Sequence, residues 1–87
     1  MNKNLIIAKL ERLNVLLEEK IEETNGSIVY WEGRIEKFGE NEIAGDATFK
    51  DCLNTAIENK EYFENEIKEN EALIKELREE VRNEAAK

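Results

Sequence analysis

The sequence predicts an all-α protein, a single domain over residues 1–87 that folds as an antiparallel two-helix coiled-coil hairpin. Three observations predict this fold. Apolar residues recur with the heptad spacing of a helix that packs along one narrow seam, an interval with two glycines separates two such stretches, and proline is absent. Charged residues form 39% of the chain and aromatic residues 7%, a composition that favours helices over a β fold.

The second helix, expected over about residues 48–86, has the clearer pattern. Its seam positions alternate in steps of four and three, and two of them, Lys60 and Asn70, are polar. Asp46 or Thr48 can cap this helix, and Thr48 followed by Asp51 resembles a capping box, which marks the start of a helix. The predicted seam of this helix consists of Phe49, Leu53, Ala56, Lys60, Phe63, Ile67, Asn70, Ile74, Leu77 and Val81.

The first helix, expected over about residues 4–39, carries a similar stripe with one stutter, two successive steps of four between positions 13 and 21. Asn25-Gly26 is a turn or helix C-cap signal, and Ser27 could cap a new helix. Because the stripe resumes in phase after Gly26, the sequence favours a kink or mild interruption there, with two helices, about 4–24 and 27–39, as the alternative. The predicted seam consists of Ile6, Leu10, Leu13, Leu17, Ile21, Thr24, Ile28, Trp31, Ile35 and Phe38.

A loop over about residues 40–47 joins the two helices, since glycines at 39 and 45 break the seam. The two stripes can be matched layer by layer around this loop, which places Leu17 opposite Asn70 and Leu10 opposite Leu77. Asn70 is then a polar seam residue of the kind that fixes register or oligomeric state.

Many apolar residues fall outside this seam, and one hairpin cannot cover them all. A chain of 87 residues also gains only a few kcal/mol of net stability from a single core. We therefore expect two hairpins to pair as a homodimeric four-helix bundle. The apolar residues outside the seam are Leu5, Ile7, Val15, Leu16, Val29, Tyr30, Cys52, Ile57, Tyr62 and Leu73.

The composition argues against an enzyme. Histidine is absent, the glycines do not have the spacing of a phosphate-binding loop, and the lone Cys52 can form neither an intrachain disulfide nor a thiolate cluster. We expect no catalytic residues, no cofactor and no metal. The net charge of −8 disfavours direct nucleic-acid binding, and the lack of a long apolar run or signal peptide predicts a cytoplasmic protein without a membrane segment.

Two features are candidate protein-binding surfaces. Residues 15–24 and 58–72, side by side in the expected register, hold ten acidic residues against three basic ones, and Glu18, Glu22 and Glu66 represent this acidic belt. A solvated helix surface is the plainer interpretation of the belt. The second candidate is the aromatic step Val29, Tyr30 and Trp31, because Tyr and Trp are enriched among binding hot spots.

Trp31 also lies on the seam, so its plainer role is in the core, and Tyr30 could belong to the dimer interface instead. We interpret the chain as a non-enzymatic protein-binding module that acts by stoichiometric binding, as an inhibitor, adaptor or assembly factor. Its small size and composition suit a bacterial or phage accessory protein. The alternative of a different class is an acidic nucleic-acid mimic that blocks a DNA- or RNA-binding protein.

The triplet Trp31-Glu32-Gly33 resembles the Trp-x-Gly motif that small secreted helical hairpins carry in their connecting turn. Tyr62 with Glu66 is similar to the Tyr-x-x-x-Asp/Glu export signal of that system. The resemblance implies export, a third alternative. It covers these few residues only, and the triplet here precedes the expected loop.

Overall fold

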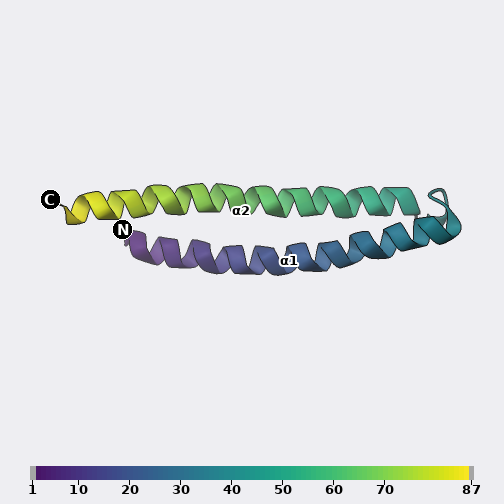
Figure 1. The fold of residues 1–87 in the computed structure, drawn as a ribbon, viewed down its shortest axis with the longest axis horizontal. Helices are drawn as coiled ribbons and strands as arrows, with labels where there is room; N and C mark the ends of the chain where they lie inside the picture. Colours follow the sequence, from purple (N-terminus) through teal and green to yellow (C-terminus); the bar gives the residue numbers. More distant parts are fainter. Residues whose placement is uncertain (1, 87) are drawn as a thin grey trace.

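The computed structural model describes residues 2–86 and shows two long helices that run antiparallel and lie side by side (Figure 1). Helix α1 spans Lys3–Phe38 and helix α2 spans Phe49–Ala85, and between them lie the short strands β1, Ile43–Ala44, and β2, Ala47–Thr48. The molecule measures 65 × 20 × 14 Å. The predicted helical hairpin is confirmed, and both helices begin and end within one residue of their expected bounds.

The connection contains a small β-hairpin that the sequence did not predict. Ile43 pairs with Thr48 and Ala44 with Ala47, and the tight turn begins at Gly45, whose φ of 66° suits glycine. No other residue among 2–86 except Gly39 has a positive φ, so the turn has the type II′ pattern that matches the twist of paired strands.

The predicted capping box at the start of α2 is confirmed. The backbone N–H of Asp51 donates to the Thr48 hydroxyl at 3.1 Å, and the N–H of Thr48 donates to the Asp51 carboxylate at 3.4 Å. At the start of α1, the side chain of Asn2 accepts a hydrogen bond from the N–H of Leu5 at 3.2 Å. Each cap satisfies amide groups that the first turn of a helix leaves without a partner.

Helix α1 continues through Asn25-Gly26, so the predicted interruption is wrong. The Thr24 hydroxyl donates to the carbonyl of Lys20 at 2.7 Å, and the Ser27 hydroxyl donates to the carbonyl of Glu23 at 3.4 Å. Both hydroxyls therefore bond back into the preceding turn rather than capping a new helix. Helix α1 curves gently along α2 without a sharp bend (Figure 1), because packing along the whole seam outweighs the weak helix propensity of one glycine.

The seam of α1 is a regular heptad without the predicted stutter. Ile7 is only 6% exposed and belongs to the seam, whereas Leu13, predicted to lie in it, is 43% exposed. Asn14 takes the seam position expected for Leu13. The buried and half-buried positions that repeat in steps of four and three along α1 are Lys3, Ile7, Leu10, Asn14, Leu17, Ile21, Thr24, Ile28, Trp31 and Ile35. All ten seam positions predicted for α2 are buried or half-buried.

The register between the helices also differs from the prediction. The side-chain amide of Asn70 donates to the Oδ1 atom of Asn14 at 2.9 Å, so Asn70 faces Asn14 rather than Leu17. The shift is three residues, about one helical turn. With this layer fixed, the heptads place Leu10 opposite Ile74. Two facing amides satisfy each other, whereas an amide facing leucine would lie in the seam without a partner.

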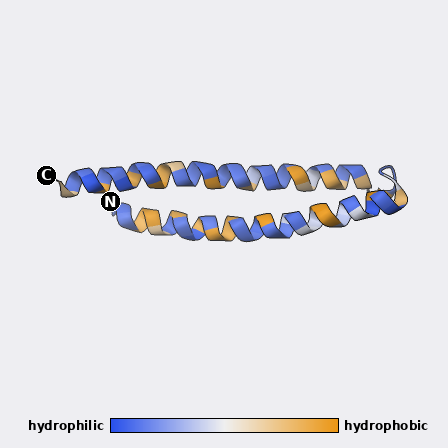
Figure 2. Ribbon diagram, in the orientation of Figure 1, coloured by the Kyte–Doolittle hydropathy of each residue, from blue (hydrophilic) through white to orange (hydrophobic). Residues whose placement is uncertain are grey.

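The core of the hairpin is thin. The buried hydrophobic residues among 2–86 are Ile7, Phe49, Ala56 and Ile74, and none of the described side chains is fully buried. Hydrophobic residues recur along both helices rather than gathering at one end (Figure 2). Within the hairpin each helix packs against one other helix, so large apolar side chains outside the seam are exposed.

Candidate binding surfaces

The seam divides the hairpin surface into two sides, and exposed apolar residues lie on both. In heptad notation, with Ile7 and Ile74 at a, one side carries the g and c positions and the other side the e and b positions. We call the first side the leucine face, defined by Leu13, Leu16, Tyr30, Tyr62 and Leu73. The second side is the groove face, defined by Val15, Glu18, Glu22, Val29 and Ile57.

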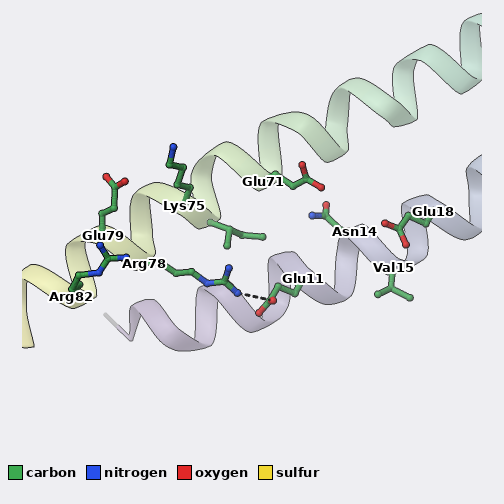
Figure 3. A pocket seen from close by; sticks show the side chains of 10 residues that line it. Glu11, Asn14, Val15, Glu18, Glu71, Lys75, Arg78, Glu79 and Arg82 are labelled. Atoms are coloured by element: carbon green, nitrogen blue, oxygen red, sulfur yellow. Dashed lines mark hydrogen bonds and ion pairs between the residues drawn. The ribbon is translucent and has the colours of Figure 1, made fainter.

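The groove face contains an open groove of about 510 Å³ between the two helices near the chain termini (Figure 3). Arg78 of α2 reaches across to Glu11 of α1, with 2.9 Å between its Nη2 atom and the carboxylate. Both signs of charge and two aliphatic side chains therefore line the groove, a composition suited to another polypeptide. The lining residues are Glu11, Asn14, Val15, Glu18, Glu71, Ile74, Lys75, Arg78, Glu79 and Arg82.

The three residues of the aromatic step do not form one surface. The Tyr30 and Trp31 rings meet edge to face with centroids 4.9 Å apart, and Trp31 is half-buried against Phe49 at 5.5 Å. Val29 is 69% exposed, but it lies on the groove face, whereas Tyr30 lies on the leucine face. Successive residues of a helix point about 100° apart, so Val29 and Tyr30, although adjacent in the sequence, belong to different surfaces.

The acidic belt is also divided. Glu18 lines the groove and Glu22 lies one turn further along the same face, whereas Glu66 lies on the leucine face. What the structure does bring together is a row of five glutamates on the groove face of α1, with no basic residue among the e and b positions of that helix. This glutamate row consists of Glu11, Glu18, Glu22, Glu32 and Glu36.

An aromatic cluster around Arg34 was not recognised from the sequence. The guanidinium carbon of Arg34 lies 4.6 Å from the centroid of the Phe38 ring, 5.6 Å from that of Phe49 and 6.0 Å from that of Tyr30. The Arg34 Nε atom is buried without a hydrogen-bond partner among residues 2–86. Cation–π attraction to these rings therefore stabilises the position of the Arg34 guanidinium. The four-residue spacing of Tyr30, Arg34 and Phe38 is the signal that could have revealed it.

Within residues 2–86, no three His, Cys, Asp or Glu residues lie close enough together to hold a metal ion. No helix in the same range is long and apolar enough to cross a membrane. The Trp-x-Gly resemblance requires the motif to lie in the connecting turn, but Trp31-Glu32-Gly33 lies inside α1.

Comparison with protein-family models, curated proteins and solved structures gives no match for this chain. The two faces of the hairpin are therefore the features from which we infer a function.

Proposed function

We propose that this chain is a non-enzymatic protein-binding module that acts by stoichiometric binding, as an inhibitor, adaptor or assembly factor. The observation that carries the proposal is the presence of large, exposed apolar side chains on both faces of a thin hairpin. A second hairpin can cover one face, which leaves the other for a different protein. Contiguous apolar patches rimmed by polar residues mark interaction sites on soluble proteins.

Self-association is the first part of this proposal: two hairpins pair as a four-helix bundle. The support is the small core, because burying further apolar surface is the main source of stability open to so short a chain. A four-helix bundle gives each helix two neighbours in place of one.

The groove face is the surface that we propose for the protein partner. Val29, exposed on α1, and Ile57, exposed on α2, provide apolar contact area, and Glu18 and Glu22 provide negative charge. A partner that fits this surface has an apolar centre, with basic residues where it meets the glutamate row of α1. Opposite charges at the edge of such an interface accelerate association and fix orientation, while the apolar centre provides most of the affinity.

Affinity capture with a matched variant tests the partner surface. The chain is immobilised, bound proteins are quantified by mass spectrometry, and the wild type is compared with Val29→Glu and with Ala72→Glu, which adds the same charge at an exposed position on the outer surface of α2. We expect a partner in near-equimolar amount that Val29→Glu loses and Ala72→Glu keeps. Tyr30→Ala, measured in parallel, tests the aromatic step. Equal capture by all variants contradicts the proposed site.

A nucleic-acid mimic is the second candidate function, favoured by the glutamate row of α1. Such a row presents negative charge along one side of α1 to a basic groove that otherwise binds phosphates. DNA or RNA displaces a mimic from its partner, and salt steeply lowers the affinity of that binding. Salt does not steeply lower the affinity of an apolar contact. Reversing Glu18 and Glu22 to lysine then abolishes capture by slowing association.

A further inference from the structure

We propose that the leucine face is the surface that binds a second copy of the chain, with both connecting hairpins at the same end of the bundle. In this dimer, α1 of each copy packs antiparallel against α2 of the other. The inference rests on the proposed self-association and adds the face and the direction of packing.

The three leucines of the leucine face lie at neighbouring levels of the two helices because of the observed register. Asn14 faces Asn70, so Leu73 of α2 lies close to the level of Leu13 and Leu16 of α1. Leu13 is 43% exposed, Leu16 is 52% exposed and Leu73 is 41% exposed. When two hairpins stack with their loops at the same end, Leu13 and Leu16 of each copy meet Leu73 of the other, so the same contact forms twice.

The charges on this face differ between the two helices. The g and c positions of α1 carry Lys9, Lys20, Arg34 and Lys37 against a single acid, Glu23. The g and c positions of α2 carry no basic residue and four acids, which are Glu66, Glu69, Glu76 and Glu80. The leucine face therefore has a basic row on α1 and an acidic row on α2.

The two rows select the direction of packing. A two-fold axis parallel to the helices places α1 of one copy over α2 of the other, so basic rows meet acidic rows at both contacts. Lys20 then lies near the level of Glu66 in the second copy, and Lys9 near the level of Glu76. A two-fold axis across the helices places α1 over α1 and α2 over α2. That arrangement sets most charges of each row against like charges, which costs stability and disfavours it.

The groove face fits a second copy less well. Its α1 side is the glutamate row, and its α2 side mixes five basic residues with Glu61, Glu64 and Glu71, so several acids would face acids. Fewer and smaller apolar side chains lie there than on the leucine face.

Two adjacent residues provide a matched test of the face. Leu16 on the leucine face and Val15 on the groove face are 52% and 55% exposed, and both lie on the same turn of α1. Glutamate at position 16 would be buried twice in the proposed dimer, once from each copy. We expect Leu16→Glu to weaken dimerisation at least about 100-fold and Val15→Glu to leave it nearly unchanged. Sedimentation equilibrium at micromolar concentration measures this against the monomer mass of 10.1 kDa, with circular dichroism to show that helicity is retained.

A distance between two spin labels tests the direction. One label is attached at Asp46→Cys in the connecting turn, on a Cys52→Ala background, and the separation within the dimer is measured by pulsed electron paramagnetic resonance. Loops at the same end place the labels on the order of the 20 Å width of a hairpin apart, whereas loops at opposite ends place them close to its 65 Å length.

Each outcome has a separate meaning. A short label distance, with dissociation by Leu16→Glu only, supports the inference. A distance near 65 Å overturns the direction, and dissociation by Val15→Glu but not by Leu16→Glu overturns the face; in both cases the proposed self-association stands. A wild-type protein that remains at 10.1 kDa overturns both.

Discussion

Replacing Asn14 and Asn70 by alanine, singly and together, tests the hydrogen bond that fixes the register of the hairpin. The two side chains are 2.9 Å apart and half-buried in the seam, so either single substitution leaves the other amide without its partner. An unsatisfied buried polar group costs about 1–3 kcal/mol, and half-burial places this case near 1 kcal/mol. Alanine returns about 0.5 kcal/mol through its better helix propensity.

Each single variant is therefore expected to lose about 0.5 kcal/mol of unfolding free energy. The double variant loses the hydrogen bond, worth about 1 kcal/mol, and gains the helix propensity twice, so its stability stays close to that of the wild type. The coupling energy between Asn14 and Asn70 is then about 1 kcal/mol or more. Urea unfolding followed by far-ultraviolet circular dichroism measures it, at one fixed protein concentration because self-association makes stability concentration-dependent.

Additive effects within about 0.5 kcal/mol would refute the pairing, since that is the additivity expected of independent sites. The register with Leu17 opposite Asn70 has its own signature. In that register Asn14 is an exposed helix residue, and Asn14→Ala stabilises the protein by about 0.5 kcal/mol without any coupling to position 70.

Three further outcomes test the fold. Cysteines at Leu10 and Ile74, with the native cysteine removed, should form an intrachain disulfide more readily than cysteines at Leu10 and Leu77, because only facing positions come within about 7 Å; the opposite preference restores the predicted register. Gly26→Ala should raise the unfolding free energy by roughly 0.5–1 kcal/mol, since a methyl group there meets nothing within 4 Å, and destabilisation would indicate a break in α1. The pKa of Lys3 is raised above its ordinary value of 10.5, chiefly by its hydrogen bond to a glutamate of α2. The charged Lys3 therefore stabilises the folded protein fully below pH 10.5, and this contribution is lost as the pH rises through the raised pKa. The melting temperature of the wild type should therefore fall more between about pH 9 and about pH 11.5 than that of Lys3→Met, and equal falls would contradict the contact.

The candidate surfaces were only partly predictable. Tyr30 and Trp31 were selected by residue type, and the structure does pack them together. Leu13 was assigned to the seam through the stutter, so its place on the leucine face was missed. An error of one position in the phase of a helix moves a side chain by about 100°, enough to transfer it between the core and one face. The same rule decides which glutamates lie on which face, so their division between the two faces can be predicted only when the helical phase is correct.

The sequence by itself determined the features that depend on neighbouring residues: two helices from heptad spacing, the start of α2 from Thr48 and Asp51, and a connection at the glycines. Only the tertiary structure decided the register, the continuity of α1 and the division of the surface into two faces. The physical reason is that sliding one helix by a turn returns an apolar stripe to nearly the same position, so periodicity alone cannot distinguish the two registers. The pairing of Asn14 with Asn70, far apart in the chain, distinguishes them because a polar group in a seam needs a partner.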